Sequence, residues 1–270
     1  MKCLPVCIVR SLMLAMGTIV LTPVWAAQEV RVGAAHFPPY TVRPECGVDT
    51  GLLPQLLEAL NQLQSDFHFV ITPTSNARRF REFAQGRVDM VLFENPAWGW
   101  QGIAHDRVDM GLQDAEVFVA KRQPERQQSY FDDIASKRLA LFNGYHYAFA
   151  GFNASPQYLS TAFQAILTYS HESNLMMVVR GRVDIALITR SHLADLLQHN
   201  AQAKGQVMVS DRTDYIYRHA ALLRPHGPIT PQAFAQMMEA LRENGRLTEI
   251  FAPYNVAVVA QEPVREAVVP

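Results

Sequence analysis

The feature that most constrains the fold is a short motif that occurs once in each half of the chain. Residues 80–93 read FREFAQGRVDMVLF, and residues 176–189 read MMVVRGRVDIALIT. In both, a helical pattern runs into Gly-Arg-Val-Asp, and an apolar run follows. Glycine suits the left-handed position after a helix, and short apolar runs bounded by turn signals are typical of strands buried in a parallel sheet. The repeat therefore predicts two α/β lobes of similar design.

The first residues have the pattern of an export signal. Lys2 and Arg10 are basic, residues 11–21 are apolar, and residues 24–26 read VWA, with small residues where cleavage needs them. The apolar run is shorter than the ~20 residues that a membrane span requires. We therefore expect a signal peptide over residues 1–26 and a mature protein in the periplasm.

Composition narrows the class of protein further. The chain has 24 basic and 25 acidic residues, so its net charge is −1, and 49% of its residues are apolar. Nucleic-acid and membrane surfaces favour concentrated positive charge, so neither is an expected partner. Once the signal peptide is removed, Cys46 is the single cysteine and has no partner within the chain for a disulfide. The nine histidines show no metal-ligand spacing, and we expect a monomer without cofactor or metal.

Strand and helix signals alternate along the rest of the chain. Strands are expected at residues 30–35, 67–72, 90–93, 116–120, 137–142, 185–188, 207–209 and 216–223. Helices are expected at residues 51–63, 76–85, 158–167, 191–198, 230–244 and 246–251. Residues 257–270 have no such pattern, and we expect them to form a C-terminal tail.

Four motifs in this order resemble the extracytoplasmic solute-binding proteins of bacterial transport systems, in particular the family that binds polar amino acids. The motifs are FPPY at 37–40, FAQGRVDMVLF at 83–93, EVFVA at 116–120 followed by KRLALFNGYHY at 137–147, and GRLTEIF at 245–251. The resemblance covers nearly the whole mature chain.

The resemblance implies a type II periplasmic-binding fold of the α/β class. In that fold two lobes are joined by two crossing strands, and the ligand lies in the cleft between the lobes. Here lobe one would hold residues 27–118 and 218–256, and lobe two would hold residues 119–217. The crossings would lie near residues 117–121 and 215–222.

The resemblance also implies a function. The protein would capture a small polar molecule, an amino acid or a related compound, and deliver it to the inner-membrane permease of an ABC-type transporter. A receptor domain that signals to a membrane sensor protein is the alternative. An enzyme is not expected, since the chain lacks a Gly-x-Ser-x-Gly elbow and a zinc-protease helix. Some relatives of the fold dehydrate small molecules with cleft carboxylates, for which only Glu94 and Glu172 are candidates.

One departure from the family bears on the ligand. The family usually has a Ser/Thr-rich loop and then an Arg that grips the ligand's carboxylate, whereas residues 93–103 here read FENPAWGWQGI, with no Arg before Arg107. Glu94 takes the place of a polar ligand contact. A carboxylate in a closing cleft needs a positive or hydrogen-donating partner. That partner is either Arg78 or Arg79 of the protein, or an amine or hydroxyl of the ligand.

The remaining candidate residues lie in loops at the carboxyl ends of predicted strands, where ligands bind in open α/β sheets. The full set of expected ligand-binding residues is Phe37, Tyr40, Arg79, Glu94, Asn95 and Trp98 from lobe one, with Asn143, Gly144, Tyr145 and His171 from lobe two. Ordinary packing of the loops and of the lobes is the alternative for the aromatic residues. A plain strand-to-helix turn is the alternative for residues 143–145.

Overall fold

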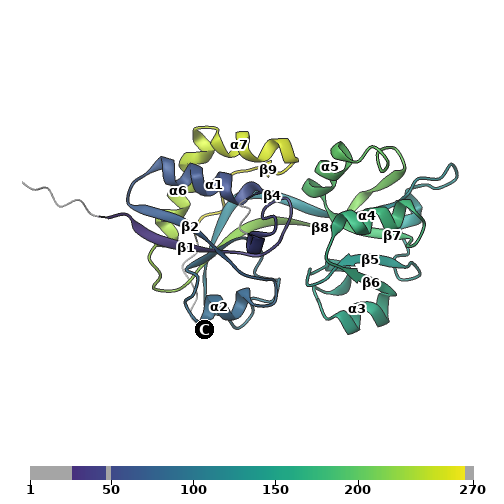
Figure 1. Ribbon diagram of the computed structural model, residues 1–270, viewed down its shortest axis with the longest axis horizontal. Helices are drawn as coiled ribbons and strands as arrows, with labels where there is room; N and C mark the ends of the chain where they lie inside the picture. Colours follow the sequence, from purple (N-terminus) through teal and green to yellow (C-terminus); the bar gives the residue numbers. More distant parts are fainter. Residues whose placement is uncertain (1–25, 47–49, 265–270) are drawn as a thin grey trace, which may run out of the picture.

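A computed structural model describes residues 26–46 and 50–264, and these form two lobes joined by two long antiparallel strands (Figure 1). The joining strands are β4 (Asp106–Lys121) and β8 (Val207–Leu223), and each extends into both lobes. The predicted signal peptide lies outside the described residues except for Ala26. No helix among the described residues is long and apolar enough to cross a membrane.

Lobe one consists of the N-terminal part of the chain and the last helices. Its strands are β1 (Gln28–Ala34), β2 (Phe67–Pro73) and β3 (Met90–Glu94). Its helices are α1 (Leu52–Leu63), α2 (Arg79–Ala84), α6 (Pro231–Glu243) and α7 (Arg246–Phe251), with short 3-10 turns at Pro44–Cys46 and Ala252–Tyr254. Helix α6 begins as its sequence predicts, because Thr230 accepts a hydrogen bond from the backbone N–H of Ala233 at 3.2 Å.

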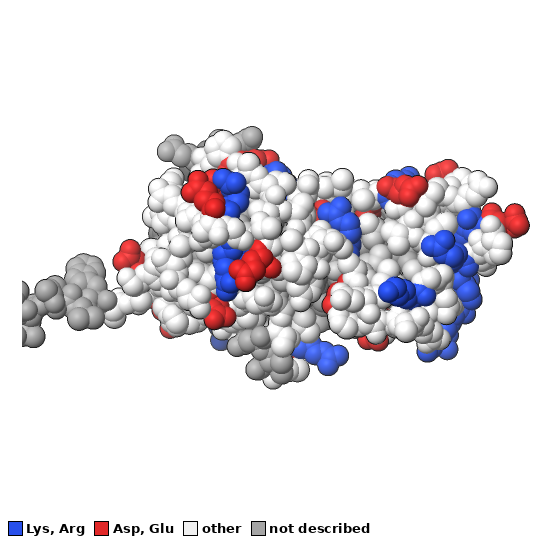
Figure 2. Space-filling model, turned by 90° about the horizontal axis from the view of Figure 1, so that it is seen from above, with Lys and Arg blue, Asp and Glu red and all other residues white. Residues whose placement is uncertain are grey.

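Lobe two repeats this plan with the middle of the chain. Its strands are β5 (Leu139–Phe142), β6 (Ala165–Thr168) and β7 (Ile185–Thr189), and its helices are α3 (Pro156–Phe163), α4 (His171–Val179) and α5 (Arg190–His199). Short 3-10 turns lie at Gln128–Phe131 and Ala148–Ala150. Seen from above, Lys and Arg side chains gather at the outer end of this lobe (Figure 2).

The strands form one hydrogen-bonded ladder in the order β2-β1-β3-β8-β4-β7-β5-β6, with β9 (Ala257–Val258) added to β4. The ladder is continuous because β4 and β8 belong to both lobes. The hydrophobic cores are nevertheless separate: Val32, Leu56 and Phe234 lie in the core of lobe one, whereas Val119 and Leu141 lie in the cores of lobe two. The two-lobed α/β fold is therefore confirmed, while the residue boundaries of the lobes stay a prediction.

The repeated motif performs the same task in each lobe. Gly86 and Gly181 have φ angles of 71° and 69°, the left-handed conformation expected after a helix. The aspartate that ends the motif is hydrogen-bonded to an arginine of the neighbouring strand segment. In lobe one this arginine lies in β1, and in lobe two it directly precedes β5. The backbone N–H of Asp89 donates to the carbonyl of Arg31 at 2.8 Å, and that of Asp184 donates to the carbonyl of Arg138 at 2.9 Å. Each carboxylate then accepts hydrogen bonds from the guanidinium of the same arginine.

Several expected elements differ from the structure. The strand predicted at residues 116–120 is the end of β4, which begins at Asp106, and the helix predicted at residues 76–85 begins at Arg79. The helix predicted for residues 158–167 ends at Phe163, because Gln164 takes a left-handed conformation with φ of 48°, and β6 follows. The strands predicted at residues 207–209 and 216–223 are parts of the single strand β8. Residues 210–215 between them are mostly polar, because they lie where the strand passes from one lobe to the other and not in a core. They therefore lack the apolar pattern by which a strand is predicted from sequence.

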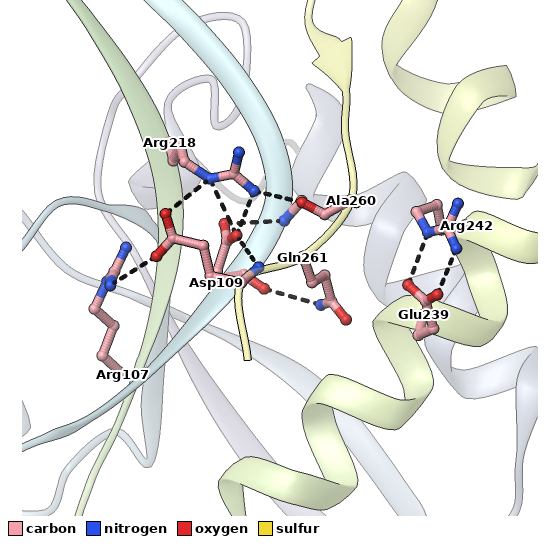
Figure 3. Close-up of polar contacts among 9 residues, drawn as sticks. Arg107, Asp109, Arg218, Glu239, Arg242, Ala260 and Gln261 are labelled. Carbon is pink, nitrogen blue, oxygen red and sulfur yellow. Dashed lines mark hydrogen bonds and ion pairs between the residues drawn. The ribbon is translucent and has the colours of Figure 1, made fainter. Parts of the chain in front are cut away.

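Residues 257–264, which the sequence suggests are part of a tail, lie along β4. The side chain of Gln261 donates to the carbonyl of Asp109 at 2.9 Å, and Arg218 of β8 donates to the carbonyl of Ala260 at 2.6 Å (Figure 3). The carboxylate of Asp109 also accepts from Arg218 at 3.1 Å. This segment therefore fastens both joining strands on the side of lobe one.

Candidate ligand-binding cleft

Two cavities lie between the lobes. The first, which we call the chamber, measures about 60 Å³ and is lined by residues that include Phe37, Thr74, Arg79, Glu94, Trp98, Glu116, Tyr145 and Tyr217. The second, which we call the groove, measures about 1140 Å³ and is lined by residues that include His36, Arg78, Asn143, His171, Glu172 and His192. The two cavities share Thr74, Asn76, Arg79, Gly144 and His146, so these residues form the neck between them.

The chamber lies where the topology brings strand ends together. Phe37 follows β1, Thr74 follows β2 and Glu94 ends β3, while Gly144 and Tyr145 follow β5 of the other lobe. These are the carboxyl ends of parallel strands, the edge at which open α/β sheets bind ligands. Side chains from both lobes therefore meet around one cavity.

Glu94 is held by groups of the protein. Its Oε1 lies 2.8 Å from Nε of Arg79, and its Oε2 accepts a hydrogen bond from the indole N–H of Trp100 at 2.8 Å. The Nε–H bond of Arg79 does not point at the oxygen, so we describe this contact as an ion pair. Burial raises the pKa of Glu94, and Arg79 and Trp100 oppose that rise. Of the two partners that the sequence leaves open for Glu94, the arginine is the one found here.

Glu116, on β4, is a second buried carboxyl in the chamber. Its Oε1 accepts hydrogen bonds from Thr189 at 2.7 Å and Tyr217 at 3.3 Å, but its Oε2 has no partner among the described residues. Burial, with smaller contributions from Asp114 and Asp214, raises the pKa of Glu116 to about 8. At pH 7 this carboxyl is therefore mostly protonated.

Three more buried polar atoms of the chamber have no hydrogen-bond partner in the described part of the chain. They are Oγ1 of Thr74, Nε1 of Trp98 and the hydroxyl of Tyr145. Buried polar atoms in folded proteins are nearly always hydrogen-bonded, and each exception calls for an explanation. Together with Glu116, four residues that line one small cavity each have a buried polar atom without a partner, which a small polar molecule could satisfy.

The groove is lined by histidines from both lobes. His36 belongs to lobe one, and His171 and His192 of lobe two have ring centroids 5.5 Å apart. Burial lowers the pKa of all three, to about 4 for His192, and burial also lowers that of His146 at the neck to about 4. These imidazoles are therefore neutral near pH 7 and add no positive charge to either cavity.

The structure brings most of the expected ligand-binding residues together. Phe37, Arg79, Glu94, Trp98, Gly144 and Tyr145 line the chamber, and Asn143 and His171 line the groove. Tyr40 and Asn95 line neither cavity. Tyr40 is fully buried with its hydroxyl 2.6 Å from Oδ2 of Asp114, and Asn95 accepts from the backbone N–H of Ala97 at 2.9 Å.

Sequence reasoning missed several lining residues, among them Thr74, Glu116, His146 and Tyr217. Thr74 had a usable signal, since it lies two residues after a predicted strand, at the binding edge of the sheet. Glu116 had none, because it opens the run EVFVA, in which every residue is buried and no alternation marks one face.

A family of known transport proteins matches most of this chain. The model of a family described as the periplasmic substrate-binding protein of a phosphonate ABC transporter matches residues 54–260. It supports the broad resemblance to bacterial solute-binding proteins, but names phosphonate and not polar amino acids. No curated protein matches the chain significantly.

Solved structures of similar fold are numerous. A histidine kinase sensor domain with similarity to periplasmic binding proteins is 16% identical, with a TM-score of 0.64 over 85% of this chain and 96% of its own. An ancestral arginine-binding protein bound to arginine is 15% identical, with a TM-score of 0.62 over 85% of this chain and 99% of its own. An ancestral amino acid-binding protein, a precursor of cyclohexadienyl dehydratase, is 16% identical, with a TM-score of 0.61 over 84% of this chain and 94% of its own. At these identities the likeness concerns the fold alone.

Proposed function

Because the chain belongs to the family of periplasmic substrate-binding proteins of phosphonate ABC transporters, we propose that it captures a small polar molecule between its lobes and delivers it to an inner-membrane permease. The observation that carries this proposal is the chamber. Its lining comes from both lobes and both joining strands, and it holds four buried polar groups without partners among the described residues. A ligand there would contact both lobes at once.

Such a site favours closure of the lobes when it is filled. A ligand shifts the equilibrium toward the state in which it makes more contacts, and hinge closure around a ligand is the common motion of this type of protein. The joining strands have irregular register between Asp109 and Gln113 and between Glu116 and Val119, where bending is easiest. The neck is narrow, because a Cβ on Gly144 would lie 3.7 Å from Cβ of Asn76 in the other lobe.

A thermal-shift screen tests the proposal. At a ligand concentration 100 times the dissociation constant, binding adds roughly 2.7 kcal/mol of stability, or about 5–11 °C in Tm for a chain of this size. The panel contains amino acids, amines, phosphonates and sugars. Tyr145→Phe, which removes one unpartnered hydroxyl of the chamber, should weaken the best hit, whereas Tyr158→Phe on the exposed face of α3 should not. A panel without any hit, or a hit that ignores Tyr145→Phe, would contradict binding in the chamber.

Signalling is the second candidate function, since a histidine kinase sensor domain has a similar fold. The two functions differ in what cells lose without the protein. Delivery to a permease predicts loss of uptake of the hit compound. Sensing predicts normal uptake and loss of the transcriptional response to that compound.

An enzymatic role has less support. The two carboxylates named as candidates for dehydration chemistry are separated, since Glu94 lines the chamber in an ion pair with Arg79 and Glu172 is exposed in the groove. We therefore propose binding without turnover. Product formation from any hit compound, followed by chromatography, would refute this.

A further inference from the structure

The two carboxyl groups in the chamber differ in what they can offer a ligand. Glu94 already has an ion pair to Arg79 and a hydrogen bond from Trp100. Glu116 uses only one oxygen, and its Oε2 has no partner in the described part of the chain. The available acceptor of charge is therefore Glu116.

Four aromatic rings line the chamber together with this carboxyl, and one of them, Tyr217, donates a hydrogen bond to it. The ring centroid of Phe37 lies 6.0 Å from that of Trp98 and 5.4 Å from that of Tyr145, and the centroid of Trp98 lies 5.1 Å from that of Tyr217. All four rings line the chamber. Aromatic faces attract cations, and most strongly where water is excluded, so the walls favour a positive group beside Glu116.

The other unpartnered atoms fit an N–H donor as well. The hydroxyls of Tyr145 and Thr74 can each accept a hydrogen bond, and an ammonium group has three donors and no acceptor. The indole of Trp98 can only donate, so it suits an acceptor elsewhere on the same ligand. The chamber thus provides three unpartnered acceptors, in Glu116, Tyr145 and Thr74, and its donors are the indole of Trp98 and the same two hydroxyls.

The charges of the chamber disfavour an anion. Among the described residues that line the chamber, Arg79 is the only cationic side chain, and Glu94 already neutralises it. His146 at the neck is neutral near pH 7 because burial lowers its pKa to about 4. A doubly charged phosphonate would therefore lose its hydration without meeting a free counter-charge, which is strongly unfavourable.

We infer that the chamber binds the primary ammonium group of the ligand, with Oε2 of Glu116 as the counter-ion and the rings of Phe37, Trp98, Tyr145 and Tyr217 as walls. The inference rests on the proposed function, since it names the class of ligand for the same cleft. The larger groove then takes the rest of the molecule, and the indole N–H of Trp98 meets an acceptor near the ammonium.

Binding of an ammonium requires the carboxylate form of Glu116, so one proton leaves when the ligand enters. The titratable groups around Glu116 come from several elements: Asp114 on β4, Asp214 and Tyr217 on β8, Tyr40 after β1, and Tyr145 and Tyr147 after β5. Burial raises the pKa of these four tyrosines, so they stay neutral. Asp114 is held by the hydroxyl of Tyr40 at 2.6 Å and lies 3.6 Å from Arg190. Glu116 is therefore the group expected to change charge between pH 6 and pH 9.

This linkage has a measurable size. With the pKa of Glu116 near 8, the dissociation constant of an ammonium ligand should fall about fiftyfold from pH 6 to pH 8 and change little between about pH 8.5 and pH 9. At higher pH the amine itself loses its proton and binding should weaken again. At pH 7, about 0.9 proton should be released for each ligand bound. A neutral ligand would show neither effect.

The experiment uses ethanolamine, L-alanine and putrescine as ammonium probes, with ethylene glycol and methylphosphonate as probes that lack the ammonium. Titration calorimetry in buffers of different ionisation enthalpy gives affinity and proton release together. At least one ammonium probe should bind, and it should bind more tightly than ethylene glycol and methylphosphonate. Glu116→Gln should weaken it at least tenfold and remove the pH dependence, whereas Glu58→Gln on the exposed face of α1 should change nothing.

Several results would overturn the inference, and they separate it from the proposed function. Tightest binding by ethylene glycol or methylphosphonate would refute the ammonium head group and leave ligand capture intact. Retention of affinity and pH slope in Glu116→Gln would refute the role of Glu116. If Glu116→Gln does not fold, the pH profile and proton release of the unaltered protein decide the question. Failure of every probe here and of every compound in the wider screen would refute both proposals.

Discussion

Each copy of the Gly-Arg-Val-Asp motif ends in an aspartate that forms an ion pair with an arginine, and one pair is more buried than the other. The effect of burial on an ion pair can therefore be measured within one chain. We predict that Asp89→Asn destabilises the protein much more than Asp184→Asn. The side chain of Asp89 is 3% exposed and accepts hydrogen bonds from Arg31 at 2.8 and 2.9 Å and from Arg224 at 3.0 Å. That of Asp184 is 30% exposed, and its one ion-pair partner among the described residues is Arg138, which is 51% exposed.

The magnitudes follow from these environments. Asp89→Asn removes charge-assisted hydrogen bonds from a buried carboxylate, but it leaves two arginines that are 37% and 30% exposed and can be hydrated. We therefore expect a loss near the worth of one such hydrogen bond, about 1.5–3 kcal/mol. An exposed pair contributes about 1 kcal/mol or less. For a chain of this size the expected loss in Tm is about 3–12 °C for Asp89→Asn and at most about 2–4 °C for Asp184→Asn.

The pH dependence provides a second check on the same pair. Burial raises the pKa of Asp89, but the hydrogen bonds from Arg31 and Arg224 outweigh it, and hydrogen bonding to Arg138 lowers the pKa of Asp184. A lowered carboxyl pKa contributes stability above the unfolded value near 4 and loses it as the pH falls through the folded value. The deficit of each Asn variant should therefore shrink below about pH 4.

Urea unfolding followed by circular dichroism measures both variants against the unaltered chain. The free energy of unfolding should fall with urea concentration at the same slope as in the unaltered chain, because the surface exposed on unfolding is the same. The urea concentration at the midpoint of unfolding should be lower. Equal losses in the two variants, or a larger loss for Asp184→Asn, would refute the reasoning from burial.

Three further predictions concern the cleft. Glu94→Gln leaves Arg79 without its buried counter-ion, so we expect a loss of about 3–5 kcal/mol in a chemical melt; a loss below 1 kcal/mol would contradict the pairing. Burial lowers the pKa of His146 and His192 to about 4, so below pH 6.5 the unfolded chain binds more protons than the folded one. The Tm should therefore fall from pH 6.5 to pH 4, and the fall should be smaller when both histidines are replaced by Asn. Gly144→Ala and Gly205→Ala both strain a left-handed residue, but only Gly144→Ala, which faces the other lobe, should alter the affinity for a hit compound.

Much of the fold could be predicted from local pattern. The helix, glycine and buried strand of each repeat follow from sequence, because the apolar run and the left-handed glycine act within a few residues. The joining strands could be predicted only in part: residues 106–115 contain Asp109, Gly111 and Asp114, which argue against a strand. Their partners are distant in sequence, since Asp109 pairs with Arg218 and Asp114 with Tyr40.

The candidate site was predictable where a loop follows a strand. Phe37, Trp98 and Tyr145 lie in such loops and line the chamber. The partner of Glu94 was left open, because only the packed structure shows that both Arg79 and Trp100 reach it. Glu116 could not be predicted from the sequence. Its interest lies in Oε2, which has no partner in the described part of the chain, whereas Thr189 and Tyr217 both donate to Oε1.

The most direct test of ligand capture between the lobes is the distance between them with and without a hit compound. Spin labels at Gln62→Cys on α1 and Gln198→Cys on α5, both exposed positions, report that distance in a chain in which Cys46 is replaced by Ser. We predict a distance distribution that shifts to shorter values and narrows when the compound is added, and that Tyr145→Phe requires more compound for the same shift. A distribution unchanged at a saturating concentration of a compound that binds would contradict capture in the cleft.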